Sequence, residues 1–177
     1  TNAGNYGLWI NGSNKTGAPS RSTIVNNMFI GGNQGVRLQS TKHVNIYHNS
    51  IFGNNRGLHL EANFNNNFDL VNNIIVSDLG EAIFASNNPV AAKFDYNVYF
   101  TNGSTPFQLN SNSYATLAAW QTALTTENDS SLFGDPLFTA PYDLRIVLGT
   151  IANDKGDNTV GVLTDIDQNT RPASGST

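Results

Sequence analysis

The chain has 177 residues, a formal net charge of −4 and no cysteine. This length suits a single domain with a buried core, and the lack of cysteine excludes disulfide bonds, zinc–thiolate sites and a thiol nucleophile. Only nine residues are Lys or Arg and they form no basic run, which argues against a nucleic acid as partner because phosphates are neutralised by clustered cations.

A repeat of 22 to 24 residues runs through about the first hundred residues. Its first marker is a segment of alternating apolar residues at 35–38, 57–60 and 81–84, with an earlier copy at 7–10 that a loop over 14–20 displaces by 28. Its second marker is an asparagine before a short apolar run, with spacings of 22, 24 and 24, at Asn27, Asn49, Asn73 and Asn97. The two markers keep step, which indicates consecutive units of one kind.

Each unit has the pattern of short strands. Apolar residues alternate with polar ones, as at Val36 and Leu38 or at Val44 and Ile46. Strands that recur at this period, separated by Gly and Asn turns, predict coils that stack and pair in parallel. A period of about 18 residues would be typical of the left-handed hexapeptide type, so the longer period favours the right-handed form. We therefore predict an all-β fold, a right-handed parallel β-helix with coils of 22–24 residues.

The four aligned asparagines predict a ladder at one turn of the coil. Stacked side-chain amides bond one another and satisfy backbone groups that are costly to bury unpaired. We assign these asparagines to structure and not to a functional site.

The period is lost after Phe100, and the rest of the chain reads differently. Leu117, Trp120, Ala123 and Leu124 lie at helical spacing and predict one short α-helix over 113–126. We expect this helix to cover the last coil, with Trp120 in the core, because the end of a solenoid exposes an unpaired edge and apolar side chains. An irregular closing segment would complete a single domain over 1–177, with regular coils over 1–100 and the helix and closing segment over 101–177.

The chain enters its repeat within the first residues, so we expect it to be part of a longer protein. The remaining coils of that protein, or another chain, would then stack on the N-terminal end. No apolar run approaches the roughly 20 residues that span a bilayer, and we expect no membrane insertion.

Five short motifs follow Phe100: LAAW at 117–120, DPLF at 135–138, YDLR at 142–145, DKGDN at 154–158 and TDIDQNTRP at 164–172. Together with the repeat, the chain resembles the C-terminal part of bacterial surface and secreted proteins with pectate-lyase-like parallel β-helix repeats, in particular those described as choice-of-anchor Q proteins. Gln168 replaces a Gly common in that family, and the family's closing acidic and aromatic motif does not follow Pro172. The resemblance implies a secreted or cell-surface bacterial protein. It leaves activity open, because the family includes polysaccharide lyases and proteins without known activity.

One outward row of side chains is the best candidate for a site. If Val36 and Leu38 point inward, Arg37 and Gln39 point outward, and adjacent coils are about 4.8 Å apart. The alignment then forms one row of Trp9, Arg37, His59 and Ile83 beside a second row of Asn11, Gln39, Glu61 and Ala85.

This row suits an acidic polysaccharide. We assign catalytic roles to Arg37, which would neutralise a uronate, and to His59 and Glu61, which would transfer a proton. Trp9 would stack on a sugar ring, with Asn11 and Gln39 as further substrate-binding residues. The simpler alternative is a solvated face with incidental Arg–Glu pairs of little energetic weight. Another outward row, with Thr23, Asn45, Asp69 and Lys93 beside Val25, Tyr47, Val71 and Asp95, predicts a salt-bridged surface.

Two functions remain open. One is an extracellular, lyase-like enzyme, or part of one, that acts on acidic polysaccharide. The other is a non-catalytic adhesin, stalk or module that binds a polysaccharide or surface glycan. We expect no cofactor and no metal site, because Asp165, Asp167 and Asn169 imitate half of a calcium loop but Thr170 stands where its glycine belongs.

Overall fold

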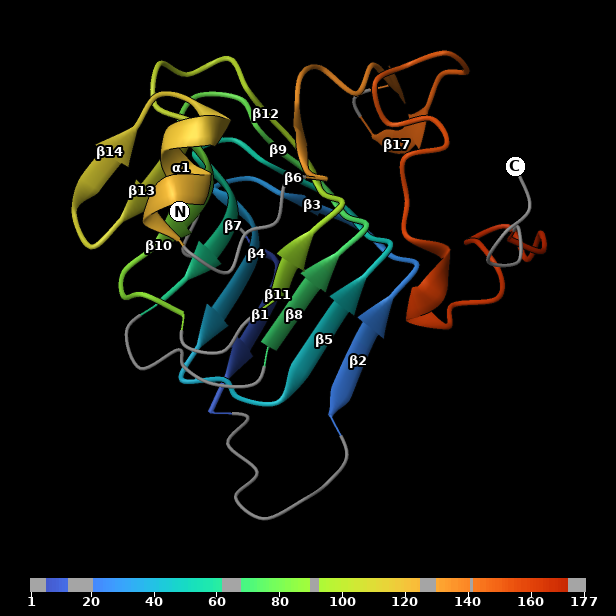
Figure 1. The fold of residues 1–177 in the computed structure, drawn as a ribbon, viewed down its shortest axis with the longest axis horizontal. Coiled ribbons are helices and arrows are strands. Elements are labelled where there is room, and N and C mark those ends of the chain that lie inside the picture. Colours follow the sequence, from blue (N-terminus) through green and yellow to red (C-terminus); the bar gives the residue numbers. More distant parts are fainter. Residues whose placement is uncertain are drawn as a thin grey trace.

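Three β-sheets form the sides of a coil, and the same side of each coil pairs in parallel with the next (Figure 1). The structure is a computed structural model that describes residues 6–12, 21–61, 68–89, 93–124, 130–140 and 142–171. Sheet A contains β1 (Tyr6–Asn11), β4 (Gln34–Gln39), β7 (Arg56–Leu60), β10 (Glu81–Ala85), β13 (Phe107–Leu109) and β14 (Asn112–Tyr114).

The other two sheets follow the same order. Sheet B contains β2 (Ser22–Val25), β5 (Val44–Tyr47), β8 (Phe68–Val71) and β11 (Lys93–Asp95). Sheet C contains β3 (Met28–Gly31), β6 (Ser50–Gly53), β9 (Ile74–Ser77), β12 (Val98–Thr101) and β15 (Leu132–Phe133). This arrangement confirms the predicted parallel β-helix, and the ladders of sheets A and C continue beyond residue 100 in β13 and β15.

The core is made of inward rows in which each apolar side chain lies on the equivalent residue of the next coil. In sheet A, Leu38 pairs with Leu60. In sheet C, Ile51 pairs with Ile75, which pairs with Tyr99. All of these side chains are fully buried. Burying one such side chain contributes about 1.5–3 kcal/mol, so the alternation seen in the sequence stabilises every coil.

The fourth coil departs from the prediction at two positions. Ile83 and Ala85 were predicted to point outward, but they pair with Leu58 and Leu60 and are buried in the core. Phe84 takes the outward position and pairs with His59. The cause is the turn before β10, which has three residues at 78–80 where the turn before β7 has two at 54–55. The extra residue raises the spacing between equivalent positions to 25, as between Arg56 and Glu81. Leu79 in this turn is 66% exposed and leaves the core register undisturbed.

The asparagine ladder is confirmed. The Asn49 amide donates to the Asn73 carbonyl oxygen Oδ1 at 3.1 Å, and the Asn73 amide donates to Asn97 Oδ1 at 3.1 Å. Each amide also donates to backbone carbonyls of its own and the preceding coil, as Asn73 does to Val71 and Ile46 at 3.0 and 2.8 Å. The ladder thus satisfies the polar groups of a turn that lies next to the core.

A helix closes the far end of the stack. α1 (Leu117–Ala123) begins at the N-cap Thr116, whose hydroxyl accepts from the Ala119 backbone N–H at 3.2 Å. Trp120 is completely buried and stacks on Phe107 with ring centroids 5.2 Å apart, which confirms its place in the core. The helix is shorter than the predicted 113–126, because residues 112–114 form β14, which pairs antiparallel with β13 at the edge of sheet A.

The last part of the chain, residues 142–171, lies along the side of the coils, and we call it the strap. In Figure 1 its orange and red trace follows the ends of β2 and β5. It begins with β17 (Asp143–Ile146), which pairs antiparallel with β16 (Phe138–Ala140), and it contains the 3-10 helix η1 (Asn158–Val160). Within the described residues, no helix has the length and apolar character needed to cross a membrane.

The ladder generates the first prediction. Replacing Asn73 with Ala removes an amide that satisfies buried backbone groups, and each unsatisfied group costs about 1–3 kcal/mol. We expect Asn73→Ala to lower the free energy of unfolding by at least that amount in urea denaturation. Asn55→Ala is the matched control, since the Asn55 amide bonds Asn33 on the exposed surface, and it should change stability by at most about 0.5 kcal/mol. Equal losses in the two variants would contradict a special role for the ladder.

Candidate functional site

The outer face of sheet A brings the predicted site residues together. Trp9 pairs with Arg37, and Arg37 pairs with His59, so these three residues lie side by side on consecutive coils. Asn11 pairs with Gln39 at the ends of the same strands. Glu61 follows directly after β7, where its backbone N–H donates to the carbonyl of Leu38 at 2.9 Å. The predicted juxtaposition across the first three coils is therefore correct.

Arg37 is the centre of this face. Its Nε donates to Glu61 Oε2 at 2.8 Å, and its Nη2 also contacts that oxygen. Its Nη1 donates to the Tyr6 hydroxyl at 2.6 Å. The guanidinium carbon lies 5.4 Å from the ring centroids of both Tyr6 and Trp9, a geometry for cation–π attraction. All three guanidinium nitrogens are thus bound within the protein.

Trp9 is held in place yet open to solvent. Its ring lies 5.6 Å from that of Tyr6 and against the guanidinium of Arg37. It is nevertheless 50% exposed, the largest side chain so exposed on this face. An aromatic surface that is already immobilised loses little conformational entropy when a ligand stacks on it.

His59 is held very differently from a solvent-exposed base. It is only 7% exposed, and its Nδ1 lies 3.0 Å from Gln34 Oε1, so Nδ1 carries the proton that it donates. Its Nε2 is buried without a hydrogen-bond partner among the described residues. Burial, aided by the nearby charge of Arg56, lowers the pKa of His59 to about 4. The imidazole is therefore neutral at pH 7.

A further row on the same face was missed by the sequence analysis. Gln34 contacts His59, Tyr6 contacts Trp9, and the guanidinium of Arg56 lies 3.7 Å from the ring centroid of Phe84. Strict alternation from Val36 would place Gln34 on the inner face. The alternation breaks at Gly35, and Gln34 therefore lies on the outer face beside His59. The available signal was the position before each of the first three repeat markers and the first position of the fourth, where the row is formed by Tyr6, Gln34, Arg56 and Glu81.

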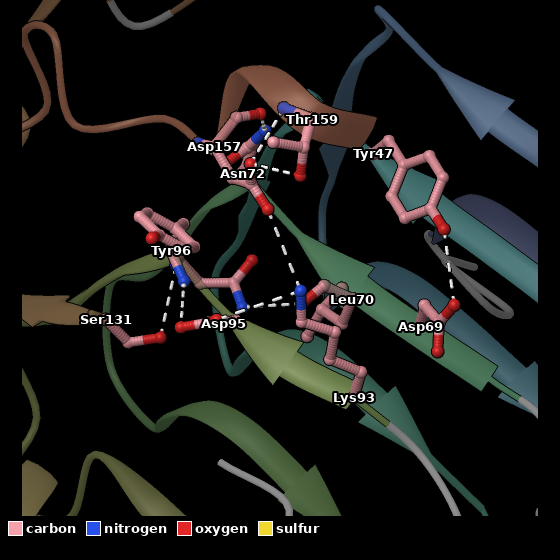
Figure 2. A network of polar contacts seen from close by, with 11 residues as sticks. Tyr47, Asp69, Leu70, Asn72, Lys93, Asp95, Tyr96, Ser131, Asp157 and Thr159 are labelled. Carbon is pink, nitrogen blue, oxygen red and sulfur yellow. Dashed lines mark hydrogen bonds and ion pairs between the residues drawn. The ribbon is translucent and has the colours of Figure 1, made fainter. Parts of the chain in front are cut away.

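The outer face of sheet B carries the salt bridges predicted for it. Asp69 pairs with Arg21 and accepts from the Tyr47 hydroxyl at 3.2 Å. Burial and the Asp69 charge raise the pKa of Tyr47 to about 12. Lys93 lies 3.8 Å from Asp95. Figure 2 shows the contact of Tyr47 with Asp69 and, on the neighbouring strand, Lys93 near Asp95.

Asp165, Asp167 and Asn169, which imitate half of a calcium loop, form a turn that is closed by its own hydrogen bonds. The Asp165 carboxylate accepts from the backbone N–H groups of Asp167 and Asn169 at 2.9 and 2.8 Å, while Asp167 pairs with Arg145. In the part of the chain that the structure describes, no three His, Asp or Glu side chains gather in a group that could hold a metal ion. The loops over 14–20 and 63–67, which flank the Trp9 face in sequence, lie outside the described residues.

Acidification is expected to destabilise the fold through His59. An unfolded His has a pKa of about 6.5, whereas the folded value is about 4. Between these values the unfolded chain binds a proton that the folded chain does not, so the free energy of unfolding falls as the pH falls through this window. His59→Asn removes the group that binds this proton. Thermal unfolding of the variant should therefore show a smaller loss of stability than the wild type between about pH 7 and about pH 4.5. Gln39→Asn, which does not titrate, should keep the wild-type loss; an unchanged loss in His59→Asn would contradict the prediction.

Comparison with known families agrees with the architecture. A family model described as the right handed beta helix region matches residues 1–122, which include both rows of the outer face of sheet A. The match confirms the predicted right-handed form, and a domain of this kind is compatible with carbohydrate-associated enzymes and binding proteins. Comparison with curated proteins and with solved structures gives no match. The chain belongs to the right-handed β-helix family.

Proposed function

We propose that this chain is a carbohydrate-binding β-helix, with Trp9 as the platform on which a sugar ring stacks. The observation that carries the proposal is the half-exposed Trp9 ring, held against Arg37 and Tyr6. The apolar face of a sugar ring packs on such an aromatic surface, and polar groups at its edge bond the sugar hydroxyls. Asn11 and Gln39, which extend from the same strands, supply those polar groups.

The ion pairs on this face favour binding over proton transfer. Arg37 is neutralised by Glu61 in a pair whose side chains are 18% and 25% exposed, and Arg56 is paired with Glu81. A uronate would have to compete with these carboxylates, whereas sugar hydroxyls can bond the pairs without breaking them. We therefore propose a hydroxyl-rich polysaccharide or surface glycan as the partner. The family resemblance supports a secreted or cell-surface place of action in bacteria.

A lyase-like activity on acidic polysaccharide is the second candidate, and the buried Nε2 of His59 is the observation that favours it. This nitrogen has an unused lone pair beside the Arg37–Glu61 pair. In such a reaction, Nε2 would take the proton next to the uronate carboxylate, a carbon–carbon double bond would form, and the glycosidic oxygen would leave with the bonding electrons. The activity requires movement that exposes Nε2 to the substrate.

Binding to a glycan panel tests the first candidate. We expect Trp9→Ala to weaken binding of the best glycan by about tenfold, because the stacked ring and its buried area are lost. Tyr142→Ala is the control, since Tyr142 is an aromatic residue that is 86% exposed on the strap, and it should bind as the wild type does. Wild-type affinity in Trp9→Ala would refute the platform. In the same mixtures, unsaturated products that are lost in His59→Ala would establish the lyase instead.

We also propose that a further β-helix coil stacks on the N-terminal end. β1, β2 and β3 are the terminal strands of the three sheets. Ile24 and Phe29 on these strands are only partly buried, whereas their partners Ile46 and Ile51 in the next coil are fully buried. Covering that apolar surface with one more coil would stabilise the stack.

A duplicated coil tests this stacking. Inserting a second copy of residues 34–55, which contains β4, β5 and β6, before β1 supplies one strand for each sheet in the order of the coils, and we expect the melting temperature to rise by a few degrees. The control inserts the same segment with Val36, Leu38, Val44, Ile46 and Ile51 replaced by serine, which removes its apolar inward rows. Equal melting temperatures for the two insertions would show that this end does not accept a coil.

A further inference from the structure

The strap is docked on one column of turns, between sheets B and C. Asn26, His48, Asn72 and Tyr96 occupy equivalent positions in four coils, each with a positive φ between 53° and 61°. This left-handed backbone places the four residues just before the ladder asparagines, at the corner where the strap passes. Asn and His adopt such a conformation more readily than most residues.

Two clamps attach the strap to this column. Asn72 accepts from the Asp157 backbone N–H at 2.7 Å and donates to the Asp157 carbonyl at 2.8 Å, as Figure 2 shows from close by. Asn26 donates to the Thr164 carbonyl at 2.6 Å and accepts from Arg171 at 3.0 Å. The position between the two clamps is that of His48.

Two adjoining hollows lie under the strap at that position. The larger has a volume of about 770 Å³ and the smaller about 300 Å³. Both are lined by His48, Ser50, Ile74, Ile146 and Arg171. The larger volume is in the range of sites that hold small organic ligands.

Arg171 is the unusual group in this lining. Its guanidinium donates to neutral oxygens, those of Asn26 and of the Thr164 carbonyl. Among the described residues it forms no ion pair, and burial lowers its pKa although Asp165 opposes this shift. The Asp165 oxygens already accept from Asn169 and from the Asp167 backbone. A partly buried cation without an acidic partner costs free energy, which a bound anion would offset.

His48 adds a hydrogen-bond donor to the same place. The Asn72 amide lies 3.0 Å from His48 Nε2, so Nε2 accepts and Nδ1 carries the proton. Burial and the Arg171 charge lower the pKa of His48 to about 4, which keeps the ring neutral at pH 7. The charged residues that line the larger hollow are Asp154, Lys155 and Arg171. Their formal sum is one positive charge, which again suits one anionic group.

We propose that the larger hollow binds a small hydroxylated carboxylate of the size of a sugar acid. The carboxylate would accept from Arg171 and from His48 Nδ1–H, and Ile74 and Ile146 would pack against the carbon skeleton. Asn158, on η1 at the rim, would bond the hydroxyls. This site lies on a different side of the coil from the Trp9 platform and goes beyond the function proposed for it. Its ligand would bridge the strap and the coils.

Galacturonate and galactose are the probes, because they share one ring and differ in the carboxylate. In amide NMR titrations of the full chain, galacturonate should shift the signals of Ser50, Asn158 and Arg171 saturably, and galactose should not. We expect Arg171→Gln to weaken galacturonate binding by at least about tenfold, since it removes a charge-assisted hydrogen bond. Arg37→Gln is the matched control, with the same loss of charge on the other face, and should leave these shifts unchanged.

A second variant separates binding from docking of the strap. His48→Phe removes the Nδ1 donor but leaves both clamps, so it should weaken binding while the unliganded signals of Asp157 and Thr164 keep their wild-type positions. Arg171→Lys, which keeps the charge, should retain part of the affinity. Three results would overturn the proposal: no saturable shift around the hollow, equal binding of galactose and galacturonate, or undiminished binding in both Arg171→Gln and His48→Phe.

Discussion

Hydrogen bonding in the buried asparagine ladder is the interaction on which the other features depend. A three-sided coil must turn between sheets B and C beside its core, where water cannot satisfy the backbone. Asn49, Asn73 and Asn97 solve this in successive coils, and the first two amides also bond the next asparagine. Ser131 continues the column by accepting from the Asn97 backbone N–H at 3.2 Å. Because the ladder aligns equivalent residues of each coil, it also determines which side chains stand together on the outer faces.

The parts of the molecule that repeat could be predicted from the sequence. The coils, the ladder and the adjacency of Arg37 and His59 follow from period and alternation, and the spacing of 22 between these two includes no insertion. Ile83 was misplaced because one added residue near Leu79 changes the spacing, and Gln34 was missed because the alternation breaks at Gly35. The position of the strap could not be predicted from the sequence in this way. Its contacts, such as that of Asn72 with Asp157, join residues 85 apart and follow no repeat.

The two candidate sites use charge in opposite ways. On sheet A, Arg37 is neutralised by Glu61, and the exposed feature is the aromatic ring of Trp9. Under the strap, Arg171 is bound by neutral oxygens and keeps its full charge. His59 and His48 are both neutral because burial lowers their pKa values to about 4. The first surface suits a neutral sugar ring, and the second suits the end of a ligand that carries a carboxylate.

The exposed turn around Leu79 has a consequence for how such a protein diversifies. The turn absorbs an added residue in solvent, while the ladder at the opposite corner restores the register of the core within the same coil. The added residue at this corner therefore stays out of the core, yet it changes which residue of the following strand joins the outer face. A lineage of these proteins can vary its surface chemistry through the lengths of its turns and leave the interior unaltered.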